Sequence, residues 1–265
     1  MQYAIYLLML FSLLAACVSR EPEPATESFS HRDSTSEDSL TADATPIDTA
    51  PHEINWEAVD IRLAPGTLAY GLQCGRVEET RKRLGTLYGK QHITMDSIAV
   101  IFTELLVNDI IPYWYGTPWS FEGHTDTPGQ GEIACGYFVS TTLLHVGVNL
   151  HRYKLAQQSP INEAKTLSLG DPIIILSDTS TKVIETIRDD FEDGIYFLGW
   201  ESSHVGYLLK RKGEVFLIHS DYYSQSKVII ERAADSEVFS FYETFYIAPI
   251  TTNKALIEKW LTQDD

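Results

Sequence analysis

Hydrophobic and polar positions divide the chain into three segments. Residues 3–16 form an apolar run without a charged side chain, whereas residues 18–53 consist mostly of Ser, Thr, Pro, Asp and Glu. From Ile54 onward, apolar residues recur at the spacings of helices and strands. Only a segment with such periodicity can bury enough surface to offset its ordering entropy. The pattern therefore predicts the segments 1–17, 18–53 and 54–265, with a folded domain in the last.

Helical spacing of apolar residues predicts four helices in the folded segment. The strongest pattern begins at Thr94, whose hydroxyl can cap the first turn, and Pro112 lies just past its end. A second helix is predicted over residues 135–148, after a loop rich in Gly, Pro and Thr. Two shorter helices are expected over residues 78–84 and 253–261.

Strand patterns dominate the second half of the chain. Two of them, over residues 204–210 and 214–219, are close enough in sequence to form the arms of a hairpin. Because helical patterns come first and strand patterns later, the order indicates an α+β fold with helices packed on an antiparallel sheet. The six predicted strands cover residues 172–176, 194–200, 204–210, 214–219, 227–231 and 243–250.

Composition limits the classes of partner. The chain has 265 residues, 44% of them hydrophobic, and a formal net charge of −17. Nucleic acids select basic surfaces, so we expect no nucleic-acid partner. Three cysteines are too few for a disulfide-built scaffold or a cysteine-rich metal site. We therefore expect one ordinary hydrophobic core, a monomer, and neither a metal ion nor an organic cofactor.

The N-terminal run has the features of an export signal. Residues 3–16 are too few to span a bilayer comfortably and fit the apolar region of a signal peptide. The run ends in Leu-Ala-Ala-Cys at Cys17, which resembles the lipobox of bacterial lipoproteins, whose cysteine is lipidated. Val18, where an Asp would retain such a protein at the inner membrane, favours the outer membrane. The acidic residues 18–53 would then form a disordered tether. The alternative is a plain secretory signal in which Cys17 has no role.

Cys135 is the candidate nucleophile. It follows the Gly-rich loop and stands in the first turn of the predicted helix 135–148. Unpaired amides and the positive end of the helix dipole favour a thiolate at this position. The alternative is a structural thiol that serves as a small hydrophobic side chain.

His204 and His219 stand at the outer ends of the two hairpin arms. A hairpin loop of suitable even length places them directly opposite each other on one face of the sheet. The second histidine could then hold and orient the first, as a nucleophilic site requires. The alternative for His219 is a hydrogen-bonded core histidine without a catalytic role.

Four short strings resemble the NlpC-type papain-like cell-wall peptidases. They are Pro-Tyr-Trp-Tyr-Gly-Thr (112–117), Ala-Cys-Gly-Tyr-Phe-Val (134–139), Ser-His-Val-Gly-Tyr (203–207) and Phe-Leu-Ile-His-Ser (216–220). Their order matches that of the family motifs and disfavours the permuted lipid acyltransferase branch, in which the histidine strand precedes the cysteine. The resemblance implies a papain-like fold for residues 54–265.

The resemblance also implies roles for individual residues. Cys135 would be the nucleophile, His204 the general base and His219 the orienting third member. Tyr113 matches a family tyrosine near the oxyanion, beside the backbone amide of Cys135. Tyr115 and Trp119 belong to an aromatic cluster that would line a substrate wall or pack beneath the loop.

The chain also departs from the family pattern around the substrate cleft. The family has an Asp before the nucleophile, where this chain has Ala134. The family has Ser-Gly after the nucleophile, where this chain has Gly136-Tyr137. Residues 150–195 form an insertion or a different substrate wall. The acids within residues 189–193 fit a solvated turn, with attraction of a cationic amine as the alternative.

The candidate nucleophile and histidines predict a cysteine hydrolase, and the resemblance implies that it cleaves an amide bond in peptidoglycan stem peptides at the bacterial cell envelope. The expected partners are peptidoglycan or muropeptides and, through Cys17, a membrane, with the domain facing the periplasm. Alternatives are cleavage between muramic acid and the first alanine, transfer to an amine instead of water, and a catalytically inactive protein that binds the cell wall or another partner.

Overall fold

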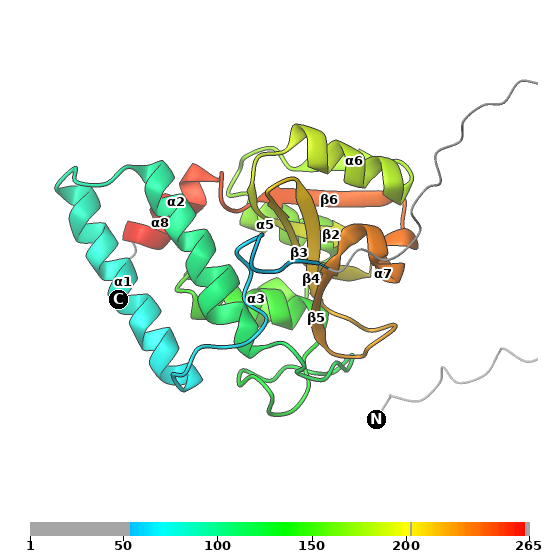
Figure 1. Ribbon diagram of the computed structural model, residues 1–265, viewed down its shortest axis with the longest axis horizontal. Coiled ribbons are helices and arrows are strands. Elements are labelled where there is room, and N and C mark those ends of the chain that lie inside the picture. Colours follow the sequence, from blue (N-terminus) through cyan, green and yellow to red (C-terminus); the bar gives the residue numbers. More distant parts are fainter. Residues whose placement is uncertain (1–53, 202, 263–265) are drawn as a thin grey trace, which may run out of the picture. The chain divides into compact units, whose positions relative to one another are not determined.

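The computed structural model describes residues 54–201 and 203–262. These residues form an α+β unit of helices and a six-stranded antiparallel sheet (Figure 1). Within the described part, no helix has the length and apolar character needed to cross a membrane. The signal peptide, the lipidation of Cys17 and the tether fall outside these residues and stay predictions.

Four of the eight α-helices in the described residues were predicted: α2, α3 and α8 lie at the expected positions, and α1 is longer than expected. The sequence pattern did not predict α4, α5, α6 or α7. Thr94 caps α2 as expected, and its hydroxyl accepts a hydrogen bond from the Ser97 amide at 3.2 Å. Helix α1 is much longer than the predicted 78–84, because polar Gln73 and Arg81 occupy its buried stripe and hide the apolar period. The helices are α1 (Tyr70–Gly89), α2 (Met95–Glu104), α3 (Cys135–His145), α4 (Arg152–Ala156), α5 (Pro160–Leu167), α6 (Ser180–Asp190), α7 (Glu237–Ser240) and α8 (Lys254–Thr262).

The sheet contains the six predicted strands, each within two residues of the expected bounds. Its order is β1-β6-β2-β3-β4-β5, and all neighbours are antiparallel. The α+β prediction is therefore confirmed at the level of fold class. The strands are β1 (Ile174–Ser177), β2 (Gly194–Trp200), β3 (His204–Arg211), β4 (Glu214–Ser220), β5 (Val228–Arg232) and β6 (Thr244–Pro249).

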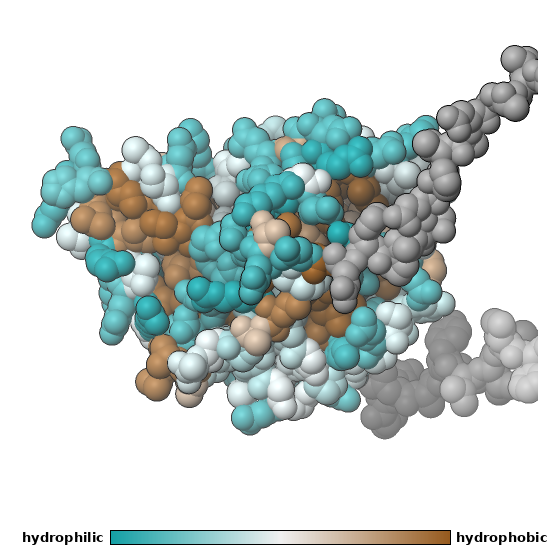
Figure 2. Space-filling view, viewed as in Figure 1, coloured by the Kyte–Doolittle hydropathy of each residue, from teal (hydrophilic) through white to brown (hydrophobic). Residues whose placement is uncertain are grey.

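Helices cover both faces of the sheet (Figure 1). Tyr207 and Ile218 belong to a core shared with α1, α2, α3 and α8, whereas Leu208 and Leu217 belong to a second core with α6 and α7. Successive residues of a strand point to opposite faces, so each central strand contributes to both cores. The outer surface over α6 is hydrophilic in Figure 2, which fits a helix whose inner side is buried against the sheet.

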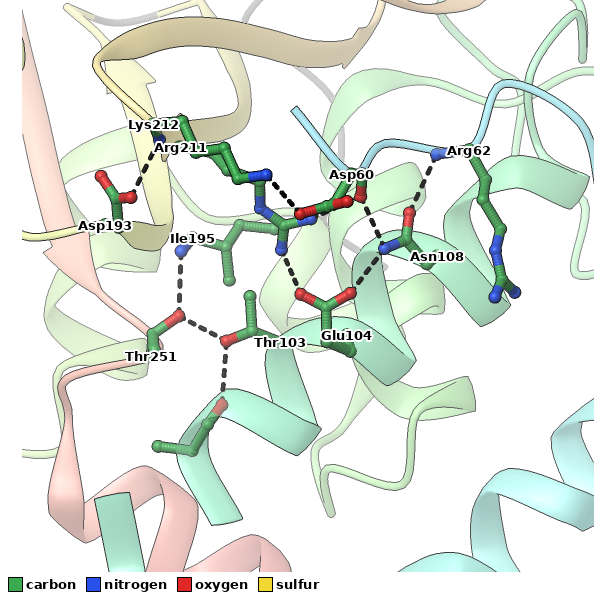
Figure 3. Close-up of polar contacts among 11 residues, drawn as sticks. Asp60, Arg62, Thr103, Glu104, Asn108, Asp193, Ile195, Arg211, Lys212 and Thr251 are labelled. Atoms are coloured by element: carbon green, nitrogen blue, oxygen red, sulfur yellow. Dashed lines mark hydrogen bonds and ion pairs between the residues drawn. The ribbon is translucent and has the colours of Figure 1, made fainter. Parts of the chain in front are cut away.

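A polar network fixes the β3–β4 hairpin to Asp60, in the segment before α1, and to α2 (Figure 3). The Arg211 guanidinium donates to the Asp60 carbonyl at 2.7 Å and to the Glu104 carboxylate at 2.5 Å. The Asn108 amide donates to the same Asp60 carbonyl at 3.0 Å. This network holds the turn end of the hairpin whose opposite end carries the two candidate histidines.

Candidate active site

The two histidines share one face of the sheet, as predicted, but their register differs from the prediction. The hairpin closes at Lys212-Gly213, whose φ angles of 51° and 78° suit a tight type I′ turn. Continuing this register places Gly206, not His204, opposite His219; a Cβ on Gly206 would lie 2.9 Å from the His219 Cβ. The predicted direct opposition is therefore wrong. The two-residue shift makes the histidines diagonal neighbours and leaves them on the same face.

The two imidazoles are in direct contact. His204 Nε2 and His219 Nδ1 are 2.9 Å apart, and the rings meet edge to face. Both side chains are buried, with 1% and 0% of the residue exposed. Trp200, paired with His204 across β2 and β3, packs its ring 5.0 Å from the His204 ring. Burial, together with the neighbouring His219, holds the pKa of His204 well below its usual range. At neutral pH, His204 is therefore an uncharged imidazole.

Glu231 on β5 extends this pair into a chain of three groups, which the sequence does not reveal. Its carboxylate lies 3.2 Å from His219 Nε2. A carboxylate only accepts hydrogen bonds, so His219 carries its proton on Nε2 and accepts at Nδ1. His204 must then donate from Nε2, which leaves a lone pair on its Nδ1. The chain of contacts therefore assigns the base position to His204 Nδ1.

Cys135 is the first residue of α3 and reaches the edge of the β3–β4 ladder. The β3–β4 pairs end at Tyr207, whereas the β2–β3 pairs continue to His204. Val205 lies beyond the last β3–β4 pair, and its backbone amide donates a hydrogen bond to the Cys135 sulfur. Gly136 allows α3 to start this close to α4, because a Cβ at this position would lie 2.6 Å from the Ala156 carbonyl oxygen.

The thiol is protonated in this arrangement, contrary to the expectation from the helix dipole. Burial raises the pKa of the Cys135 thiol to about 11. The amides of Val205, Gly136 and Cys135 itself lower this pKa, and the Glu163 carboxyl raises it further. Removing the thiolate from water thus outweighs the stabilisation that the start of α3 provides. Neither imidazole forms a hydrogen bond with the thiol in the structure, so the resting pair consists of a neutral thiol and a neutral base.

We expect Cys135 to react slowly with iodoacetamide at pH 7. A pKa of about 11 leaves little thiolate, and allowing for the greater nucleophilicity of a basic thiolate, the rate should be roughly 20-fold below that of an unperturbed cysteine. Because a raised pKa moves deprotonation to higher pH, the rate should keep rising through pH 9 and 10. Mass spectrometry of the Cys135 peptide over a pH series measures this, and a rate that is already constant at pH 7 would contradict it.

The candidate nucleophile Cys135 and the candidate base His204 both line a cavity of about 610 Å³. Helix α5 and the end of α4, both from the predicted insertion 150–195, supply part of this wall. The acids of residues 189–193 do not line it. The residues that matter for the chemistry below are Cys135, His204, Trp119, Tyr222, Tyr242 and Glu163.

The three predicted aromatic site residues separate in the structure. Trp119 lines the cavity, as expected for a substrate wall. Tyr113 lies outside the cavity wall, and its hydroxyl donates to the Leu68 carbonyl at 2.7 Å, which does not fit the implied oxyanion role. Tyr115 also lies outside that wall, with a buried hydroxyl that lacks a hydrogen-bond partner among the described residues.

A different pair of tyrosines reaches the cavity. The Tyr222 and Tyr242 hydroxyls are 2.9 Å apart, and the Tyr222 ring packs 5.0 Å from the His204 ring. Asp221 holds the Tyr222 loop by accepting bonds from three following backbone amides, at 2.6–3.0 Å. Burial alone would raise the pKa of Asp221, but hydrogen bonds from the Tyr223 and Gln225 amides and from the Ser224 hydroxyl contribute to lowering the pKa below its usual value. No sequence motif marks this pair, because the two tyrosines come from separate loops.

Comparison with protein-family models finds no match, and no curated protein matches the sequence. The functional assignment therefore depends on the residues and the geometry of this chain. Groups of three or more side chains suited to a metal ion are also absent from residues 54–201 and 203–262.

Proposed function

We propose that the protein is a lipid-anchored cysteine hydrolase of the bacterial envelope, with a papain-like fold of the NlpC type, that cleaves an amide bond in peptidoglycan stem peptides. One observation carries the proposal. A chain of contacts runs from Glu231 through the buried His219 to the buried His204, and it ends at a cavity that Cys135 also lines, at the start of a helix. A carboxylate, an orienting imidazole, a basic imidazole and a thiol are the groups that nucleophilic amide cleavage uses.

The proposed reaction proceeds through a thioester. His204 Nδ1 accepts the thiol proton as Cys135 sulfur attacks the amide carbon. The negative charge develops on the carbonyl oxygen beside the backbone amides at the start of α3. The C–N bond breaks, and His204 returns the proton to the leaving amine. Water, deprotonated by the same nitrogen, then hydrolyses the thioester and restores the thiol.

A protonated resting thiol is compatible with this route if the proton moves during the attack. The thiol and the His204 ring must come within hydrogen-bond distance when substrate fills the cavity, and such contacts are often loose without substrate. The cavity suits a peptide segment, because aromatic faces and the polar side chains of Gln157 and Gln158 line it together.

Digestion of purified peptidoglycan tests the proposal. The full-length protein should release muropeptides whose masses show a break between two amino acids of the stem peptide. A product that separates the whole peptide from muramic acid would instead establish the amidase alternative. A product joined to an added amine would establish the transferase alternative. Absence of any new product under conditions in which the protein is folded would overturn the proposal.

A second candidate function is binding without catalysis. The high pKa of Cys135 and the lack of a hydrogen bond from the thiol to His204 favour it. In that case the cavity would recognise a cell-wall fragment, and the thiol would only complete its surface. Co-sedimentation with insoluble peptidoglycan separates the two functions: binding without release of soluble fragments supports the second candidate.

A further inference from the structure

Glu163 is a buried carboxyl group in the wall of the candidate active-site cavity. It lies on α5, only 2% of the residue is exposed, and its Oε2 has no hydrogen-bond partner among the described residues. Buried carboxyl groups in proteins are normally paired or hydrogen-bonded, because burial without a partner is costly. An unpartnered oxygen beside a cavity therefore points to a partner that arrives with a ligand.

The position of Glu163 is fixed by the fold. Helix α5 begins with Pro160, which packs directly on β2 at Gly199; a Cβ on Gly199 would lie 2.6 Å from the Pro160 Cβ. This close approach leaves α5 little freedom to move Glu163 toward solvent. Glu163 and Cys135 line the same cavity, and the Glu163 carboxyl raises the pKa of the Cys135 thiol.

The charge of the cavity wall favours a cationic ligand. Glu122 and Glu163 are its acidic residues, and no lysine or arginine lines it within the described ranges. Burial raises the pKa of Glu163 well above its usual range, so a bound cation would stabilise the carboxylate form that burial disfavours. His204 is uncharged at neutral pH for the reasons given above. The faces of Trp119 and Tyr222 add surfaces that attract cations.

We propose that Glu163 forms a subsite that binds a protonated primary amine of the substrate. The inference rests on the proposed function for the identity of that substrate, which would be a peptide with a free amino group near the bond that is cleaved. The amine would donate a hydrogen bond to the unpartnered oxygen of Glu163, with the aromatic rings around it. The acids within residues 189–193, for which the sequence suggested this preference as an alternative, do not line the cavity.

Ligand-induced stabilisation of the full-length protein tests the subsite without requiring catalysis. We expect n-butylammonium chloride, at about ten times its Kd, to raise the Tm by roughly 3–6 °C. Equal concentrations of n-butanol and sodium chloride should give much smaller shifts. Glu163→Gln, which keeps the size of the side chain, should lose the response to n-butylammonium. Glu122→Gln, which removes the exposed acid of the same cavity, should keep it.

Unliganded Glu163→Gln should melt at or above the wild-type temperature, because the unpaired acid is removed. A Tm well below wild type would instead assign Glu163 a structural role and overturn the inference. An equal response to n-butylammonium in wild type and Glu163→Gln would also overturn it. The Cys135→Ala variant should retain the response. Amine binding without peptidoglycan cleavage would therefore support the subsite and contradict the proposed function. Cleavage without amine binding would support the proposed function and contradict the subsite.

Discussion

Replacing Cys135 with alanine is expected to abolish muropeptide release, with a loss of at least about 1000-fold in rate. Without sulfur, no thioester can form, and the remaining histidines provide no alternative nucleophile at the same position. The substitution removes one atom from a half-buried side chain at a helix start, so the Tm should remain close to that of the wild type. Chromatography of soluble fragments released from purified peptidoglycan measures the rate.

Cys74 provides the matched control for this experiment. It is also a half-buried free thiol, and burial raises its pKa as well. It lies on α1 beside Tyr70 and does not line the cavity. Cys74→Ala should therefore release fragments at the wild-type rate. Undiminished release by Cys135→Ala would contradict the proposed chemistry, whereas equal loss in both variants would indicate a general defect of folding or of thiol chemistry.

The strands could be predicted from the sequence because their signals are local. Alternating or continuous apolar runs flanked by polar turns gave bounds within two residues, and Gly213 marked the hairpin turn. The register was not local in the same way. The two-residue and four-residue loops considered from the sequence were both centred on Arg211-Lys212 and gave the same register. Only the backbone shows that the turn lies one residue later, at Lys212-Gly213. The length of α1 was also underestimated, at residues 78–84. Its buried Arg81 bonds to the carbonyl of Trp260, a contact that the local sequence pattern does not show.

The candidate site was predictable where one motif carried the chemistry. The contact between His204 and His219 follows from two strand ends in a single hairpin. Glu231 comes from a third strand, and its position beside His219 depends on the pairing of β4 with β5, which no motif indicates. Glu163 was hidden because a charged residue on a polar helix ordinarily faces solvent, and only the packing of α5 on β2 buries it. Residues that act through tertiary contacts alone were therefore those that the sequence did not identify.

Replacing Glu231 with glutamine is expected to lower kcat about 10- to 100-fold with little change in KM. Glutamine can present its NH₂ group to His219 Nε2. His219 would then carry its proton on Nδ1 and donate it to His204 Nε2, so that the proton of His204 moves to Nδ1 and the base is lost. The variant also lacks the negative charge that stabilises the imidazolium formed during the attack. The effect should be smaller than loss of the nucleophile, because Glu231 is one imidazole further from the reaction and 21% of its side chain is exposed.

Glu214→Gln is the matched control for this substitution. Glu214 stands on β4, pairs with Arg232 at 3.4 Å and is not among the groups that contact either histidine. Both variants remove one carboxylate from the same sheet, so a shared effect of net charge or sheet stability would appear in both. Steady-state kinetics of fragment release, with the Tm of each variant, separate these possibilities. Full kcat in folded Glu231→Gln would show that His204 keeps its basic nitrogen without the carboxylate, and the chain of three groups would then have no part in setting the proton position.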